Sequence, residues 1–113
     1  MRFLKYFKQL FEGFFDLNKI KNWTINYFDN DKHSLEKRIK ERTDLDENSL
    51  NLLLDDIVSI CEKEKLDKTW IFVSFKFSCK IIINVKQFNN SLFIVTFLGK
   101  NESTKNTKNI KII

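Results

Sequence analysis

Proline is absent from this chain of 113 residues, and glycine occurs only twice, at Gly13 and Gly99. A glycine-rich phosphate loop is therefore excluded, because such a loop needs several glycines within a few residues. Tight turns must come from Asn and Asp, which enter turn conformations more readily than most residues with side chains. We expect these turns in the segments NDK (30–32), FNNS (88–91) and GKNES (99–103).

Histidine occurs once, at His33, and cysteine twice, at Cys61 and Cys79. The cysteines form no CxxC motif and neither lies near the histidine, so a zinc site is not expected. With so few soft ligands a catalytic metal site is not expected either, and we predict that the protein uses no cofactor. The two cysteines are predicted to be buried free thiols in a reducing compartment.

The N-terminus lacks an uninterrupted apolar stretch. Lys5, Lys8, Glu12 and Asp16 break up residues 1–17, which excludes a signal-peptide core and a transmembrane span there. We therefore expect a cytoplasmic protein without stable membrane insertion, located in the host cytoplasm if its source is viral.

What the chain does contain is typical of one globular domain, spanning residues 1–113. Hydrophobic residues make up 42% and charged residues 31%, and 12 Phe supply bulky core material. The net charge of +5 is spread unevenly: residues 1–42 carry about +4, residues 43–67 about −6 and residues 68–113 about +7. The acidic middle is expected to form one face, and a nucleic acid would have to approach elsewhere.

Hydrophobic periodicity predicts an α+β fold in which helices come first. An amphipathic helix is expected within residues 1–20, and residues 18–32 form a polar connector with room for a short strand or turn. Further helices are expected at 33–42 and 46–65. The apolar stripe of the last helix consists of Leu50, Leu53, Leu54, Ile57, Ile60 and Cys61.

From residue 69 the apolar period changes to two, which predicts strands at 69–77, 79–86 and 91–98 and an edge strand in the tail 106–113. Strict alternation in the third strand places Thr96 on one face together with Leu92, Ile94 and Leu98, opposite Phe93, Val95 and Phe97. Because the loops are short, we expect an antiparallel meander. Residues 31–113 would form a helical hairpin followed by a three- to four-stranded antiparallel sheet, with the N-terminal helices packed on one face.

The segment DKHSLEKRIKERTDL (31–45) holds the only histidine and two of the three arginines, Arg38 and Arg42. Histidine can give or take a proton near neutral pH, and arginine grips a phosphate with a planar fork that lysine lacks. These residue types suit metal-free RNA cleavage, in which the ribose 2′-OH is the nucleophile and cations hold the phosphate. They also suit a solvated helix that has His33 near its start and ion pairs from the arginines to Glu36 and Glu41.

The sequence HSLEKRIKERT (33–43), a longer amphipathic helix and a meander ending in FIVTFLGK (93–100) together resemble the BECR superfamily. These are the barnase, EndoU, colicin tRNase and RelE-like ribonucleases, and the small RegB-like phage endoribonucleases are the most similar branch. The resemblance covers residues 31–100 and implies a metal-independent endoribonuclease that leaves a 2′,3′-cyclic phosphate. It also implies that His33 is the acid or base, that Arg42 and Arg38 bind the scissile phosphate, and that Thr96 forms a hydrogen bond to the substrate.

Functions of other classes remain open. A non-catalytic phage-type interaction or structural protein would bind a protein partner or an antidote through its Phe-rich N-terminal helix or a sheet edge. A peripheral membrane protein would use residues 1–17 as its anchor. The aromatic residues of the strand region are either platforms for RNA bases or core and partner-facing residues; they are Trp70, Phe72, Phe88 and Phe93.

Overall fold

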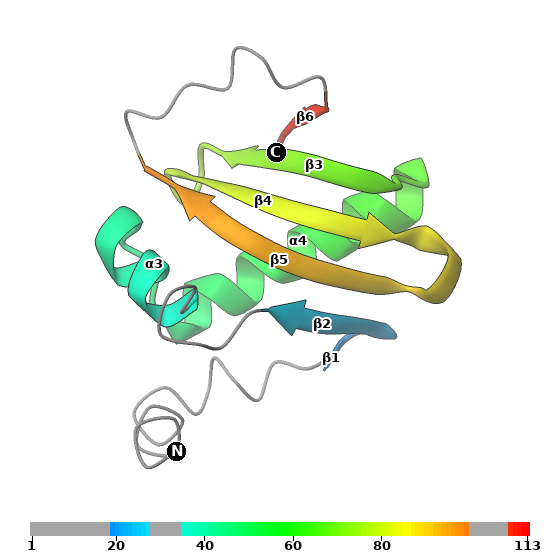
Figure 1. The fold of residues 1–113 in the computed structure, drawn as a ribbon, viewed down its shortest axis with the longest axis horizontal. Helices are drawn as coiled ribbons and strands as arrows, with labels where there is room; N and C mark the ends of the chain where they lie inside the picture. The colour runs from blue at the N-terminus through cyan, green and yellow to red at the C-terminus, as the bar shows by residue number, and fades with distance from the viewer. Residues whose placement is uncertain (1–18, 28–34, 100–108) are drawn as a thin grey trace.

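The computed structural model describes residues 19–27, 35–99 and 109–113, which form an α+β fold (Figure 1). In chain order the elements are β1 (Lys19–Ile20), β2 (Trp23–Tyr27), α3 (Leu35–Arg42), α4 (Glu47–Glu64), β3 (Lys68–Ser74), β4 (Cys79–Lys86), the 3-10 turn η1 (Gln87–Asn89), β5 (Ser91–Leu98) and β6 (Ile110–Ile112). The helix expected within residues 1–20 lies outside the described residues. No helix in the described ranges is long and apolar enough to cross a membrane.

The strands form one mixed sheet in the order β1-β2-β5-β4-β3-β6. Its centre is the antiparallel meander of β3, β4 and β5 that the sequence predicts. The prediction of a purely antiparallel sheet of three to four strands is wrong. The described chain contributes six strands, because β2 pairs with β5 in parallel and β6 pairs with β3 in parallel.

The two strands that sequence periodicity does not resolve, β1 and β2, lie in the polar connector. Only Trp23 and Ile25 of β2 are apolar and buried, a pattern too short to distinguish a strand from a turn. What makes this segment a strand is its partner, since Thr24 pairs with Ser91 and Tyr27 with Ile94. Such a distant pairing leaves little local signal in the sequence.

Helix α4 forms the second layer, behind the central strands (Figure 1). It begins at a capping box, in which the Asp46 carboxylate accepts the Ser49 backbone N–H at 2.8 Å and the Ser49 hydroxyl accepts the Asp46 N–H at 3.0 Å. Its buried stripe agrees with the predicted one, except that Val58 is buried where Ile60 is only partly covered. This stripe packs on the inward side chains of the strands and makes the hydrophobic core.

Acidic residues of α4 contact lysines near both edges of the sheet. Asp55 lies 3.7 Å from the Lys21 ammonium in the β1–β2 turn, and Lys21 also donates a hydrogen bond to Ser59. At the other edge Glu64 pairs with Lys111 of β6. Each pair contributes little by itself because it is partly exposed, but together they connect the first and last described strands to the same helix.

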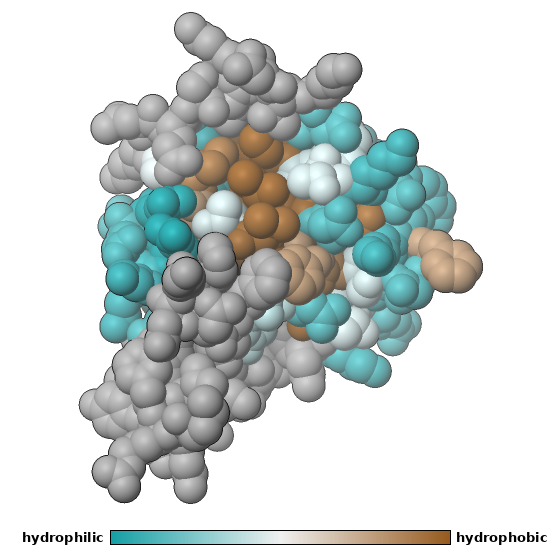
Figure 2. Space-filling view, viewed as in Figure 1, coloured by the Kyte–Doolittle hydropathy of each residue, from teal (hydrophilic) through white to brown (hydrophobic). Residues whose placement is uncertain are grey.

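The face of the sheet turned away from α4 is called the outer face here. Strand alternation and register place on it Thr24, Asn26, Thr69, Ile71, Val73, Lys80, Ile82, Asn84, Lys86, Ser91, Phe93, Thr96 and Leu98. Figure 2 shows this side, with an apolar patch over the middle of the meander and a hydrophilic surface toward the β4–β5 turn. The outer face is therefore divided into an apolar part and a polar part.

The N-terminal cap of α4 gives a stability prediction. Hydrogen bonds from the Ser49 side chain and backbone lower the pKa of Asp46 below its ordinary value of 3.8. The cap therefore stabilises the fold above about pH 4, and this stabilisation is lost as the pH falls through the lowered pKa. At pH 7 Asp46→Ala should lower the thermal unfolding midpoint, whereas Asp46→Asn should keep the cap and remove its titration. Equal midpoints for the wild type and Asp46→Ala at pH 7 would contradict the assignment.

Candidate functional site

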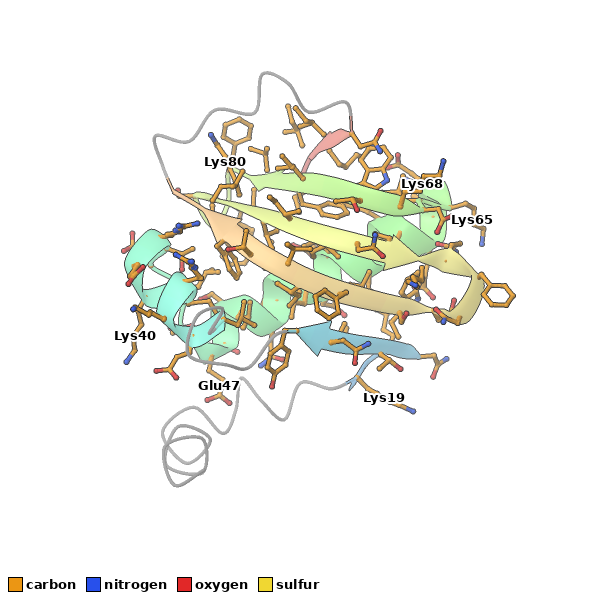
Figure 3. All side chains as sticks on the ribbon, viewed as in Figure 1. Lys19, Lys40, Glu47, Lys65, Lys68 and Lys80 are labelled. Atoms are coloured by element: carbon orange, nitrogen blue, oxygen red, sulfur yellow. The ribbon has the colours of Figure 1, made fainter. Side chains whose placement is uncertain are left out.

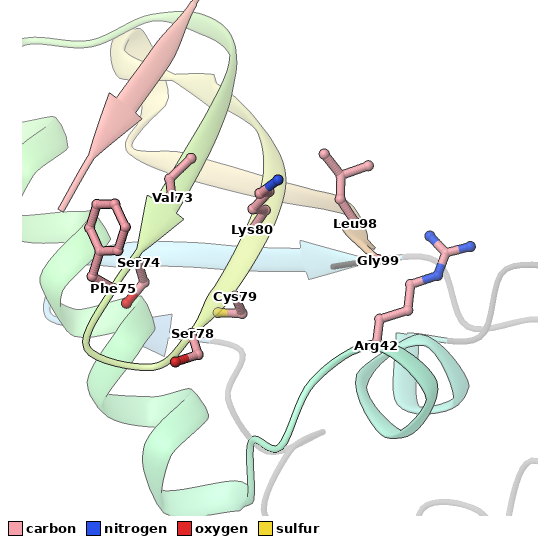
Figure 4. Close-up of a pocket in the computed structure, with 9 residues that line it drawn as sticks. All are labelled: Arg42, Val73, Ser74, Phe75, Ser78, Cys79, Lys80, Leu98 and Gly99. Carbon is pink, nitrogen blue, oxygen red and sulfur yellow. The ribbon is translucent and has the colours of Figure 1, made fainter. Parts of the chain in front are cut away.

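A pocket of about 380 Å³ opens at the end of the sheet where the β3–β4 turn, the end of β5 and the last residue of α3 meet (Figure 4). It is lined by Arg42, Val73, Ser74, Phe75, Ser78, Cys79, Lys80, Leu98 and Gly99. Arg42 is the one residue among these that the sequence analysis predicts as a site residue.

Arg42 is held in place by the way α3 packs and ends. Leu35 and Ile39 are buried against the core, so the helix can present only certain faces to solvent. The Thr43 backbone N–H and hydroxyl both donate to the Ile39 carbonyl, so the last turn of α3, which ends at Arg42, is fully hydrogen-bonded. From there Arg42 Nη1 donates to the Phe97 carbonyl of β5 at 2.7 Å. This is a charge-assisted hydrogen bond between elements that are 55 residues apart.

Thr96 reaches the same oxygen because β5 contains a bulge. Ile83 pairs with Ile94 and Ile82 with Thr96, so Val95 is the extra residue. The prediction that Thr96 shares a face with Leu92 and Ile94 is therefore wrong: after the bulge the alternation is reversed, Phe97 turns into the core and Thr96 onto the outer face. The Thr96 hydroxyl donates to the Phe97 carbonyl at 3.3 Å.

The pocket has a second cation that the sequence analysis does not single out. Lys80 pairs in register with Leu98, on the outer face of β4. In Figure 4 the Lys80 ammonium and the Arg42 guanidinium lie on either side of Leu98. The available signal was the lysine that interrupts the apolar start of CKIIINVK, but its partner across the sheet could not be read from the sequence.

Two serines and a cysteine form the floor of the pocket near the β3–β4 turn. Ser74 is buried, and its hydroxyl accepts the Phe77 N–H at 3.1 Å, which shapes the turn. Ser78 has a left-handed backbone with φ of 51°. The hydrogen bond from Phe77 gives Ser74 a structural role.

Among the described residues, the second predicted arginine lies apart from the pocket. Arg38 lies 4.0 Å from Glu41 on the same helix and does not line the pocket, which agrees with the ion-pair interpretation. Glu36 is buried and lies 3.3 Å from the Lys40 ammonium. His33 falls in 28–34, outside the described residues, so its assignment stays a sequence prediction.

The four aromatic residues predicted as possible platforms for RNA bases differ in their burial. Phe72 is fully buried in the core, and Trp70 donates its indole N–H to the Asp67 carbonyl at 2.7 Å while packing partly on the core. Phe93 lies on the outer face, partly covered. Phe88 alone of these four is almost fully exposed, at 98%.

Comparison with known proteins identifies no relative: no family model, no curated protein and no solved structure matches this chain.

The reactivity of Cys79 tests how closed the pocket floor is, and Cys61 in the core provides a comparison. Burial raises the pKa of Cys79 to about 11, and burial together with Glu62 and Glu64 raises that of Cys61 to about 12. At pH 8 a thiol with a pKa of about 11 is ionised in about one molecule in a thousand. Iodoacetamide at pH 8 should therefore leave both residues unmodified in the native protein and alkylate both in denaturant, as read by mass spectrometry. Rapid native alkylation of Cys79 would show that the pocket floor opens.

Proposed function

We propose that this protein is a metal-independent RNA endonuclease whose phosphate-binding site is the pocket at the end of β5. Arg42 and Lys80 provide the cations, and Thr96 provides a hydrogen-bonding hydroxyl on the outer face. His33 is the acid or base, a role taken from the resemblance to the BECR ribonucleases.

The observation that carries this proposal is the convergence of Arg42 and Thr96 on the Phe97 carbonyl, at 2.7 Å and 3.3 Å. The resemblance selects these two residues from different elements without any knowledge of the fold. Their meeting at one oxygen atom requires both the end of α3 and the bulge at Val95.

The chemistry needs few groups. The 2′-OH loses its proton as its oxygen bonds to phosphorus, the bond from phosphorus to the 5′-oxygen breaks, and that oxygen leaves as a hydroxyl. His33 makes one of these two proton transfers and water the other, and the product ends in a 2′,3′-cyclic phosphate. Negative charge builds on the phosphate oxygens, where a guanidinium fork and an ammonium stabilise it more than they stabilise the ground state. Arg42 presents a planar guanidinium fork, one N–H of which donates to the Phe97 carbonyl.

The distribution of charge supports an approach of RNA from the outer face. The acidic residues of the helical layer, Asp55 and Glu64 among them, lie on α4 behind the sheet. Lys80 and Lys86 lie on the outer face of β4. A polyanion is therefore repelled by one layer and attracted by the other.

The test is cleavage of a mixed-sequence RNA by the purified full chain in excess EDTA. We expect discrete cuts that end in cyclic phosphate, with the rate lowered about 100-fold or more in Arg42→Ala and His33→Ala. Arg42→Lys should remain impaired, because lysine keeps the charge but loses the fork. Thr96→Val should lower the rate as well, since it removes the hydroxyl with little change in shape.

Two controls make this test decisive. Lys63→Ala removes one exposed positive charge from α4, and its cleavage rate should equal that of the wild type. Because Arg42→Ala could also weaken the packing of α3 on β5, Lys80→Ala serves as a second pocket variant on a different element. Intact RNA at stoichiometric wild-type protein, or equal cleavage by the pocket variants, would refute the proposal.

A second function, the binding of a protein partner, is favoured by the apolar patch of the outer face. Val95 is 40% exposed there, and Ile112 of the edge strand β6 is 62% exposed. Strand addition at an edge is less favoured, because the described edge strands β1 and β6 have two and three residues. If RNA stays intact, Val95→Glu is the substitution to test against a captured partner, because it alters the patch without entering the core.

A further inference from the structure

At the end of the sheet opposite the candidate site, one of the described aromatic rings is presented to solvent. Phe88 sits at the centre of η1, in the connection between β4 and β5, and is 98% exposed. An apolar ring with this exposure contributes nothing to the core. Its ring is therefore accessible to a ligand.

The turn that carries Phe88 is held by several hydrogen bonds. The Gln87 N–H donates to the Asp67 carboxylate at 3.2 Å, and the Asn90 N–H donates back to the Gln87 carbonyl at 3.4 Å. Asn90 takes the left-handed conformation, with φ of 50°, that a turn without glycine needs. The Ser91 hydroxyl donates to the Asn89 side chain at 2.8 Å. The backbone that carries the ring is thus held in a defined turn, so a ligand does not have to order this loop.

The surroundings of Phe88 are polar and carry positive charge. A shallow pocket of about 320 Å³ is lined by Asp67, Lys68, Asn84, Val85, Lys86 and Phe88. Lys65 and Lys68 lie at this end of the molecule, and Lys80 lies near the other end of the sheet (Figure 3). A protein-docking hot spot would place the ring within an apolar patch, but the apolar patch of the outer face lies over the meander, away from this turn (Figure 2).

We propose that Phe88 stacks on a base of single-stranded RNA and that Lys68 and Lys86 contact its phosphates. An aromatic face, an amide and ammonium groups are the chemistry with which proteins hold single strands. This inference rests on the proposed function, since it assigns a substrate-binding subsite distant from the cleavage pocket.

Strand β4 connects the two sites. Alternate residues from Lys86 through Asn84 and Ile82 to Lys80 lie on the outer face, so a lysine stands near each pocket. Lys80 and Lys86 are six residues apart on this strand, which at about 3.3 Å per residue separates them by roughly 20 Å. RNA that follows β4 contacts Phe88 at one end and places a phosphate beside Arg42 and Lys80 at the other.

The experiment measures the binding of a fluorescein-labelled 2′-O-methyl RNA, which has no 2′-OH and cannot be cleaved by the proposed chemistry. Phe88→Ala and Phe88→Leu should each weaken binding about 5- to 150-fold, whereas Phe88→Tyr should retain it. Phe88→Leu separates a π-face from mere apolar surface. Leu52→Ala, which shortens an exposed apolar side chain on α4, is the matched control and should bind as the wild type does.

Salt dependence tests the lysines. Lys86→Ala should reduce the slope of log affinity against log salt by about 0.7, the value for one phosphate contact on a single strand. Lys63→Ala, which removes the same charge from α4, should leave the slope unchanged.

The outcomes separate this proposal from the catalytic one. Binding that needs the Phe88 ring, with ordinary RNA left intact, would support the subsite and refute the nuclease. Cleavage that needs Arg42, with equal binding by the wild type and Phe88→Ala, would support the nuclease and overturn the subsite. Wild-type affinity in Phe88→Leu, or no binding of the 2′-O-methyl RNA by the wild type, would also overturn it.

Discussion

The packing of α4 on one face of the sheet is the constraint on which the other features depend. Its apolar stripe closes the core, and its acidic residues Asp55 and Glu64 pair with lysines near opposite edges of the sheet. Since the described chain has one such long helix, the two faces of the sheet take different roles. The inner face is filled by aliphatic side chains and Phe, and the outer face keeps the lysines and the Thr96 hydroxyl. Of the two faces that the described residues form, the outer face is therefore the one that suits a polyanion.

Local sequence signals were sufficient for the elements whose pattern is repeated several times. The stripe of α4 and the strands β4 and β5 were predicted almost to the residue, because each presents at least four turns or alternations. β3 was predicted too long, since Phe75 continues the alternation of the strand but lies in the turn. β1 and β2 were not resolved, because their strand character depends on pairing with β5 rather than on their own residues.

In the candidate site, too, some residues could be named from short sequence motifs, whereas their contacts depend on the fold. Arg42 and Thr96 came from a resemblance in short motifs, and the structure adds why they meet: α3 ends at Arg42 and β5 bulges at Val95. A bulge has no reliable sequence signal, so strict alternation placed Thr96 on the wrong face. Lys80 was assigned to the site because it pairs with Leu98 across β4 and β5. Phe88 is exposed and Phe72 is buried, a difference that could not be read from the sequence.

The parallel pairing of β2 with β5 has a consequence for the way the chain folds. Thr24 and Ser91 are partners, yet α3, α4, β3 and β4 all lie between them in the sequence. During synthesis residues 23–27 leave the ribosome long before their partner strand exists, whereas the meander forms from neighbours. Closing so long a loop costs chain entropy. Pairing with β5 can offset this cost once the meander and α4 have packed together. β1 and β2 are thus expected to dock last, on a half-built sheet whose β5 edge is exposed until they arrive.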